Sequence, residues 1–203
     1  MAGDGCQLRQ VILGATVNQP PTIETERLRL RRLEFSDASD IQRLAGVRDV
    51  AATTRSIPHP YPDGYAERWI GDCRAESETG ALAIFAVILN ENGPEDGAFV
   101  GIIELLIDGG PPSQLAQLSY WIGKPYWNHG YATEAAKAVV KHGFTDLGLE
   151  RVRSPHFSKN PASGRVLQKI GMSHEGTLQG HLNKWGVLED GEQYGMSKAE
   201  LAD

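Results

Sequence analysis

Residues 126–135 read YWNHGYATEA, and here an aromatic and polar segment passes directly into the pattern of a helix. Apolar or small residues then recur about every 3.6 residues, at positions 132, 135, 136, 139, 140, 143, 144 and 147, which predicts one helix ending near Gly148. The first turn of a helix has N–H groups without partners and the positive end of the helix dipole. Because Gly130 lets the backbone approach a ligand closely, this junction is a candidate anion site.

The loop lacks the residues of two common nucleotide sites. It contains no Gly-Lys-Ser/Thr, which argues against a Walker loop, and it contains no GxGxxG. We therefore expect a diphosphate that is held mainly by backbone N–H groups, without a metal ion. An ordinary strand, turn and helix that contains a glycine explains the spacing equally well, so the rest of the chain has to discriminate.

The segment before the loop predicts three antiparallel strands. Residues 82–89 form a continuous apolar run, which is compatible with a central strand. Turn residues at 92–97 separate this run from a second strand at 100–107, and a further turn at 108–113 leads to a third strand at 114–122. The middle of the chain is therefore expected to be an antiparallel meander.

Helices flank this meander in the sequence. Residues 25–31 alternate apolar and charged side chains, as in a half-buried strand. Ser36 and Asp37 are expected to cap a helix that buries Ala38, Ile41, Leu44 and Ala45. The three prolines at 57–64 predict a loop, and a second helix is expected around 65–76.

The C-terminal part predicts a strand at 151–157 and then a short helix. Asn160 is its expected N-cap, Pro161 its first residue and Gly171 its end. Residues 172–198 are expected to form strands separated by a turn at 186–191. The order of elements predicts an α+β fold with one mixed sheet and helices on both faces.

The composition limits the classes of function. The chain has 203 residues, which predicts one domain at 22–203 after a weakly patterned tail at 1–21. The net charge of −6 argues against a nucleic-acid binder that neutralises phosphates. Cys6 and Cys73 give no disulfide framework, and the histidines form no HxxxH pair, so we expect no metal. The chain shows neither a signal peptide nor a membrane helix of ~20 apolar residues, so we expect a cytoplasmic protein that does not bind membranes.

Three stretches together resemble the GNAT superfamily of N-acetyltransferases, in particular the Rim-type branch that acetylates the N termini of ribosomal proteins. They are TERLRLRRLEFSDA at 25–38, YWIGKPYWNHGYATEA at 120–135 and NPASGRVLQKIGM at 160–172. The superfamily's loop pattern is Gln/Arg-x-x-Gly-x-Gly/Ala, often with Trp at its first position in this branch, and Trp127, Gly130 and Ala132 match it. The resemblance implies a GNAT-like three-layer fold with a mixed, mostly antiparallel central sheet.

Two positions depart from this branch. Asn128 stands where the branch usually has Gly, which is tolerable if the backbone angle of Asn128 is ordinary. Gln117 stands where a Glu is common on the strand before the loop. That Glu often handles the proton of the acceptor, so the identity of the base is left open.

The resemblance also implies a site for acetyl-CoA as co-substrate. The loop N–H groups that would hold its diphosphate belong to Trp127, Asn128, His129, Gly130, Tyr131, Ala132 and Thr133. The main chain of Trp121 and Ile122 would pair with the pantetheine arm, and an N–H near Ile122 would stabilise the oxyanion of the transfer reaction. Asn160 would bind a pantetheine amide, or would serve only as a helix cap. Arg165 and Lys169 could reach the adenosine phosphate, although solvation of the helix surface is the favoured explanation for each.

The catalytic groups are less clearly marked. By resemblance, Ser163 would protonate the leaving thiolate, and a solvent-facing helix serine is the alternative. Glu104 is the first candidate for the base, because its apolar neighbours on the strand are compatible with a position in a cleft; the alternative is a carboxylate that points outward. His59 and His156 are weaker candidates. The loop at 57–65 is expected to shape the acceptor entrance.

We therefore expect an N-acetyltransferase that moves an acetyl group from acetyl-CoA to a primary amine, by direct attack in a ternary complex. The expected acceptor is the N-terminal α-amine of a peptide or protein, with a polyamine or an antibiotic as alternatives. A non-catalytic acyl-CoA sensor and a nucleotide-binding protein are the competing classes. The protein is expected to be a monomer or a homodimer.

Overall fold

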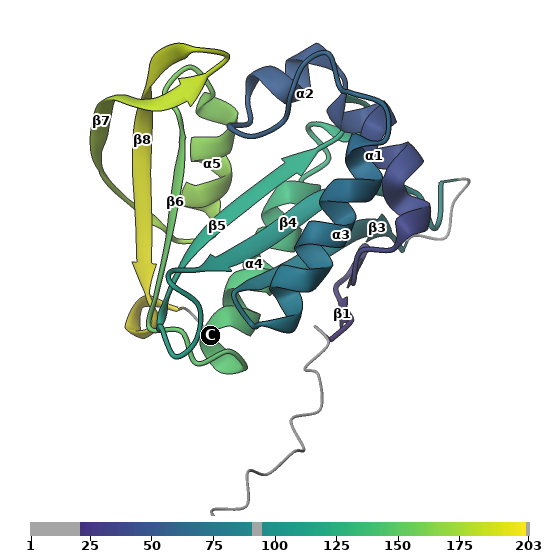
Figure 1. Ribbon diagram of the computed structural model, residues 1–203. Coiled ribbons are helices and arrows are strands. Elements are labelled where there is room, and N and C mark those ends of the chain that lie inside the picture. Colours follow the sequence, from purple (N-terminus) through teal and green to yellow (C-terminus); the bar gives the residue numbers. More distant parts are fainter. Residues whose placement is uncertain (1–20, 91–94, 202–203) are drawn as a thin grey trace, which may run out of the picture.

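A computed structural model describes residues 21–90 and 95–201, and it contains one eight-stranded sheet in the order β1-β2-β3-β4-β5-β6-β8-β7 (Figure 1). The strands are β1 (Ile23–Glu24), β2 (Leu28–Arg31), β3 (Leu82–Leu89), β4 (Phe99–Ile107), β5 (Leu115–Ile122), β6 (Arg151–Phe157), β7 (Ser173–Lys184) and β8 (Val187–Ser197). The helices are α1 (Ala38–Ala45), α2 (Arg48–Ala52), α3 (Tyr65–Glu78), α4 (Tyr131–Thr145) and α5 (Pro161–Lys169). Short 3₁₀ turns occur at η1 (Phe35–Asp37), η2 (Lys124–Tyr126) and η3 (Lys198–Glu200).

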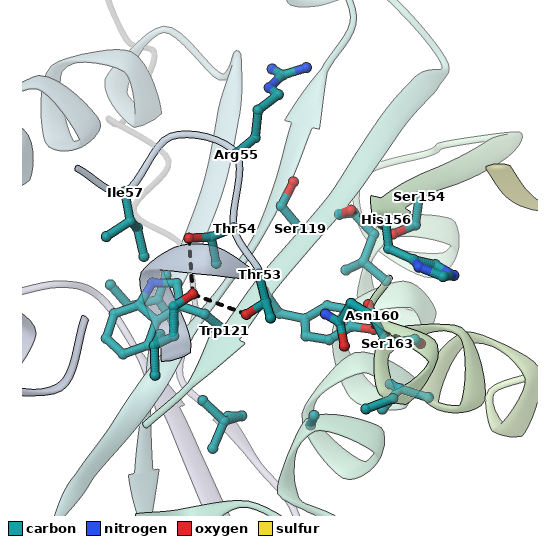
Figure 2. Close-up of a pocket in the computed structure, with 18 of the residues that line it drawn as sticks. Thr53, Thr54, Arg55, Ile57, Ser119, Trp121, Ser154, His156, Asn160 and Ser163 are labelled. Carbon is teal, nitrogen blue, oxygen red and sulfur yellow. Dashed lines mark hydrogen bonds between the residues drawn. The ribbon is translucent and has the colours of Figure 1, made fainter. Parts of the chain in front are cut away.

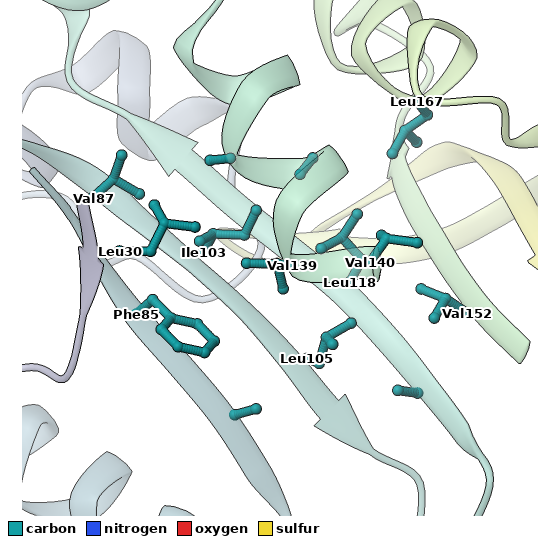
Figure 3. Packing of buried hydrophobic residues seen from close by; sticks show 14 of the residues in the cluster. Leu30, Phe85, Val87, Ile103, Leu105, Leu118, Val139, Val140, Val152 and Leu167 are labelled. Atoms are coloured by element: carbon teal, nitrogen blue, oxygen red, sulfur yellow. The ribbon is translucent and has the colours of Figure 1, made fainter. Parts of the chain in front are cut away.

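Helices cover both faces of the sheet, with α1 and α3 on one face and α4 on the other (Figure 1). Alternation along β4 divides its side chains between two cores, because successive residues of a strand point to opposite faces. Ile103 and Leu105 join Val139 and Val140 of α4 in one core (Figure 3), whereas Ile102 packs with the α1 and α3 residues. With both faces covered, every residue of β3 is buried, as its unbroken apolar sequence predicts.

The sheet opens into a fork between β5 and β6. All neighbouring strands are antiparallel except this pair, which is parallel and is paired only between residues 115–117 and 151–153. In an antiparallel ladder, residues alternate between directing their N–H and C=O groups toward the partner strand and away from it. Ser158 N–H donates to Asp190 O at 2.9 Å, so Ser158 faces β8. Pro155, an odd number of residues away, therefore directs its nitrogen toward β5. Since proline has no N–H, it cannot donate a ladder bond on that side. The sequence of β6 is therefore suited to a strand that separates from β5.

The structure confirms the α+β architecture and the antiparallel β3–β4–β5 meander. The expected strands at 82–89 and 151–157 match β3 and β6 in both bounds, and the helix predicted from Ala132 is α4. Asp37 occupies the N-cap position of α1, as predicted, but its side chain makes no capping hydrogen bond. The Asp37 carboxylate instead accepts the Glu34 N–H at 2.8 Å and pairs with the Arg31 guanidinium at 2.7 Å, since these donors precede the helix.

The C-terminal turn was placed wrongly. β7 and β8 form a long hairpin whose turn is Trp185-Gly186, and both residues have positive φ (52° and 84°). Residues 187–191 belong to β8, where Gly191 pairs with Phe157 and Leu178. The helix α2 was not predicted at all. The proposed tail lies outside the described residues apart from Pro21, and residues 91–94 of an expected turn also lie outside them. In the part of the chain that the structure describes, no helix has the length and apolar character to cross a membrane.

Candidate functional site

A cleft of about 700 Å³ follows the fork between β5 and β6. Its walls come from β4, β5 and β6, from α5, from the loop before α4 and from the segment after α2 (Figure 2). The cleft contains all the residues that the sequence singled out for binding and catalysis, apart from the weaker candidate His59: Glu104, Trp121, Ile122, Trp127, Asn128, His129, Gly130, Tyr131, Ala132, Thr133, Asn160 and Ser163. Gln117, His156, Arg165 and Lys169 line it as well.

The loop before α4 presents backbone N–H groups to this cleft. At its two ends, Trp127 N–H donates to Lys124 O at 3.3 Å and Thr133 N–H donates to Gly130 O at 3.0 Å. Between them, the N–H groups of Asn128, His129, Gly130 and Ala132 have no protein acceptor among the described residues. Such a row at a helix N-terminus suits a diphosphate.

The condition of an ordinary backbone angle at Asn128 is not met. Its φ is 66°, which is left-handed, and Gly130 follows with φ 85°. Asparagine is one of the few residues besides glycine that adopt this conformation readily. Asn128 therefore adopts the backbone conformation that a glycine would adopt. The loop geometry is thus possible although Asn128 stands in place of a glycine.

Arg27 ties the loop to the edge of the sheet. Its guanidinium donates to His129 O at 3.0 Å, pairs with Glu134 of α4 at 2.7 Å and lies 5.0 Å from the centre of the Tyr131 ring. Thr25 Oγ1 donates to the same Glu134 carboxylate at 2.6 Å. The hydrogen bonds and the guanidinium lower the pKa of Glu134 against the opposing effect of its burial. The loop is thus held in place by Arg27 and Thr25, which do not line the cleft themselves.

The main chain of β5 has a definite orientation at the fork. Gly123 N–H donates to Val100 O at 2.8 Å, so Trp121 belongs to a hydrogen-bonded pair with Ile102 and its main chain faces β4. The main chain of Tyr120 and Ile122 faces the fork instead. The Ile122 carbonyl already accepts the Trp127 indole N–H at 2.6 Å. The groups placed to pair with an extended ligand are therefore those of Tyr120 and Ile122 rather than those of Trp121.

Helix α5 forms the opposite wall. Asn160 occupies the N-cap position but its side chain makes no capping hydrogen bond, which leaves its amide for another partner. Ser163, one turn later, is half-buried, and its Oγ lies 2.8 Å from the hydroxyl of Tyr120. The alternative of a solvent-facing serine therefore does not describe Ser163. The contact joins residues 43 positions apart, which no local sequence pattern could indicate.

Glu104 faces the α1 and α3 side of the sheet. It pairs with Ile84 of β3 and Ser119 of β5 and lies at the cleft wall, so the alternative of an outward-pointing carboxylate is wrong. Burial, with a smaller contribution from the charge of Glu76, raises the pKa of Glu104 to about 7. A carboxylate with this pKa can accept a proton from an amine near neutral pH. Gln117, whose Nε2 lies 3.4 Å from Ser119 Oγ, is an amide and has no such capacity.

The two histidines are placed differently. His59 does not line the cleft; its Nδ1 lies 3.2 Å from Gly46 O and its ring lies 6.0 Å from that of Trp185. His156 is buried at the wall, where its Nδ1 lies 2.8 Å from Phe157 O. A carbonyl only accepts, so Nδ1 carries the proton and Nε2 is left without a partner among the described residues. Figure 2 shows the His156 ring turned away from the centre of the cleft.

The α1 and α3 side of the cleft has an aromatic wall that includes part of the proline loop. Tyr61, Tyr65 and Trp69 line it, and the rings of the two tyrosines meet edge to face at 5.4 Å. The adjoining segment at 53–57 was not predicted; it follows the unpredicted helix α2 and also lines the cleft (Figure 2). The hairpin supports this segment, since Lys184 Nζ donates to Ile57 O at 2.8 Å.

Among residues 21–90 and 95–201, no three His, Cys, Asp or Glu side chains are grouped so that they could hold a metal ion. The cleft is lined by a carboxylate, hydroxyls, amides, the imidazole of His156 and the basic side chains of Arg55, Arg165 and Lys169.

Comparisons with known proteins agree with this geometry. Residues 27–173 match a family model described as an acetyltransferase (GNAT) domain. An uncharacterised N-acetyltransferase, p20 of Bacillus licheniformis, is 27% identical over 185 residues, which cover 89% of this chain and 98% of that protein. The structure of RimJ from Mycobacterium smegmatis, in complex with CoA-disulfide, is similar with a TM-score of 0.76 and 23% identity, over 87% of this chain and 84% of that one. The spermidine N-acetyltransferase of Vibrio cholerae, in complex with CoA and spermine, is similar with a TM-score of 0.71 and 19% identity, over 87% and 98% of the two chains.

Proposed function

The chain belongs to the GNAT family of acetyltransferases and is an acetyl-CoA-dependent N-acetyltransferase, and from this premise we propose that it acetylates the N-terminal α-amine of a peptide or protein. The amine attacks the acetyl group directly while both substrates are bound. Similar solved structures leave the acceptor open, because RimL is named a ribosomal L7/L12 alpha-N-protein acetyltransferase and another protein is named a spermidine N-acetyltransferase. The choice between a peptide and a small amine therefore has to come from the residues of the cleft.

The loop and the fork fit the co-substrate. The diphosphate would lie on the N–H groups of Asn128, His129, Gly130 and Ala132, where the helix dipole favours negative charge. The pantetheine arm would extend along the fork-facing main chain of β5 and toward the Asn160 amide. Acetyl-CoA supplies the activated acetyl group and leaves as a thiol.

The chain's own groups would move the protons. Glu104 accepts a proton from the acceptor's ammonium group, either directly or through water, which frees the nitrogen lone pair for attack. As the C–N bond forms and the C–S bond breaks, the nitrogen loses its second proton to water, and the sulfur takes the bonding electron pair and a proton from the Ser163 hydroxyl. Glu104 then releases its proton to solvent and Ser163 regains one, so the protein is unchanged after the cycle.

The pKa of Glu104 is the observation that carries the choice of acceptor. An α-ammonium has a pKa near 8 and a lysine ammonium has one of ~10.4, so deprotonating lysine costs about 3 kcal/mol more. A base with a pKa of about 7 is therefore matched to an α-amine. The aromatic wall of Tyr61, Tyr65 and Trp69 next to a carboxylate would also suit the cation of a polyamine, which makes a small amine the second candidate.

An acceptor screen that follows the release of free coenzyme A tests the proposal. A peptide with a free N terminus is compared with the same peptide carrying a blocked N terminus and an internal lysine, and with spermidine. We expect the free N terminus to react fastest, with rates that rise from about pH 6 to pH 8 as the amine loses its proton. If the blocked peptide or spermidine reacts faster, the α-amine assignment is wrong.

Two controls separate the other classes of function. A sensor would bind acetyl-CoA, but no acceptor in the screen would cause the release of coenzyme A. A nucleotide-binding protein would bind ATP in competition with coenzyme A. We expect competition by coenzyme A itself and little by ATP, because no lysine lies in the loop at 127–133 to contact a terminal phosphate.

A further inference from the structure

The hydroxyl of the partly buried Tyr120 contacts the proposed proton donor, Ser163, directly. Its side chain leaves β5 toward the α4 and α5 side of the sheet, where it packs against the larger core. The Tyr120 hydroxyl lies 2.8 Å from Ser163 Oγ and donates to Ser163 O at 3.1 Å. Both residues line the cleft at the fork. The Tyr120 hydroxyl therefore contacts both oxygen atoms of Ser163, the carbonyl oxygen and Oγ.

The serine hydroxyl has no competing partner. A serine in the first turn of a helix commonly turns its hydroxyl toward a neighbouring backbone group. In the described part of the chain, the only polar contact of Ser163 Oγ is the Tyr120 hydroxyl. The orientation of Ser163 therefore depends on Tyr120 rather than on its own helix.

Either hydroxyl can donate in the Tyr120–Ser163 contact, and proton transfer from Ser163 to sulfur requires that Tyr120 donate to Oγ. A phenol has one proton and can share it between Ser163 Oγ and Ser163 O, since a carbonyl only accepts. When Tyr120 donates to Oγ, the Ser163 proton points away from the tyrosine and is available to the cleft. Burial raises the pKa of Tyr120, against a smaller lowering by Ser163, so Tyr120 keeps its proton throughout. It is thus a donor to Ser163 and not a proton source for sulfur.

We propose that Tyr120 is a positioning residue for proton transfer to the leaving group. It holds the Ser163 hydroxyl toward the sulfur, and its hydrogen bond stabilises the negative charge that develops on Oγ as the serine proton leaves. This inference rests on the proposed role of Ser163 in N-acetyl transfer. The bond changes are those of that reaction: the C–S electron pair and the Ser163 proton both go to sulfur, and no atom of Tyr120 is transferred.

The test compares Tyr120→Phe, Ser163→Ala and the double variant. Removing the phenol hydroxyl should lower kcat about tenfold and leave the KM for acetyl-CoA and the melting temperature nearly unchanged. Since Tyr120 acts through Ser163, the double variant should be no slower than Ser163→Ala alone. Multiplied defects in the double variant, or a wild-type kcat in Tyr120→Phe, would overturn the proposal. A rise in KM together with a fall in kcat and melting temperature would also overturn it, as the mark of a purely structural residue.

Tyr194→Phe is the matched control. Tyr194 of β8 is also buried against α5, where its hydroxyl accepts Gln168 Nε2 at 3.1 Å, but it does not line the cleft. This variant should keep the wild-type kcat. The same four proteins are assayed with the best amine of the screen and with water as acceptor in slow acetyl-CoA hydrolysis. Because thiol release is common to both reactions, a wrong α-amine assignment would change the acceptor but leave the expected Tyr120 effect in place.

Discussion

At the scale of single residues, Glu104 makes the clearest prediction. Its pKa is raised to about 7, and a base must be ionised to act, so kcat/KM should rise with pH through about 7. Glu104→Gln should lower kcat/KM roughly 10²-fold and remove this rise, leaving only the titration of the amine. The measurement is a pH–rate profile of coenzyme A release with one acceptor peptide.

Glu76→Gln provides the matched control for Glu104. Glu76 of α3 is exposed, and its negative charge contributes to the raised pKa of Glu104. Its removal should leave turnover intact and move the rise in kcat/KM to lower pH. An unchanged pH–rate profile in Glu104→Gln would show that Glu104 is not the base and would make His156 the next candidate.

Asn128 makes a second residue-scale prediction, about backbone conformation. Its side chain is exposed and its φ is 66°, so its value to the loop lies in the backbone. Asn128→Ala should lower the free energy of unfolding by about 1 kcal/mol, because alanine adopts this conformation at a cost that asparagine and glycine largely avoid. Asn128→Gly should remain close to the wild type in denaturant melts. Equal stability of the alanine and glycine variants would show that the angle carries no strain.

At the scale of elements, the sequence predicted those whose pattern is set by burial. Strand β3 is apolar throughout because it is covered on both faces, and α4 has a long stripe because it packs along the sheet. Helix α2 has only five residues, which is too few for a period to appear. The hairpin turn was misplaced because Trp185 adopts φ 52°, a conformation that tryptophan rarely takes, so the sequence did not predict a turn that begins before Gly186.

The candidate site divides in the same way. The loop at 127–133 and Asn160 were predictable because a helix start, a glycine and a cap lie close together in the sequence. The Tyr120–Ser163 contact and the position of the 53–57 segment were not, because they depend on how distant elements meet. Glu104 lies between these cases. Its alternation with apolar neighbours suggested a sheet position, but only the register with Ser119 places its side chain at the cleft.

The β7–β8 hairpin makes the element-scale prediction. Lys184 is buried at its tip, where Nζ donates to Ile57 O and lies 4.6 Å from the centre of the Trp185 ring. Burial lowers the pKa of Lys184 to about 8 from its usual 10.5. Between about pH 8 and pH 10.5 the unfolded chain binds more protons than the folded chain. The free energy of unfolding of the wild type should therefore rise with pH relative to that of Lys184→Met.

Denaturant melts at pH 7.5 and pH 10 measure this difference. Lys198→Met is the control, because Lys198 is exposed and pairs loosely with Glu150 at 3.8 Å. Its free energy of unfolding should change in parallel with that of the wild type. A Lys184→Met variant that also runs parallel would mean that Lys184 ionises normally in the folded protein.

At the scale of the whole molecule, the fork joins two half-sites built on opposite faces of one sheet. Glu104 lies on the α1 and α3 side with the aromatic wall, whereas Ser163 and the anion loop lie on the side of α4 and α5. An unbroken ladder between β5 and β6 would separate them. Because the pairing stops at Gln117 and Arg153, the acceptor and acetyl-CoA can approach each other through the sheet while both remain bound.

This arrangement predicts a sequential kinetic mechanism. A ping-pong mechanism needs a side chain that carries the acetyl group between two half-reactions, most readily a cysteine. Cys73 is buried in α3, does not line the cleft, and has a pKa raised by burial to about 12, so it is a poor nucleophile. Initial rates at varied acetyl-CoA and peptide concentrations should give intersecting double-reciprocal lines. The double variant Cys6→Ala and Cys73→Ala should keep the wild-type kcat. Cys6 is included because it lies outside the described part of the chain. Parallel lines, together with an acetylated enzyme isolated in the absence of acceptor, would show instead that the two half-sites act one after the other.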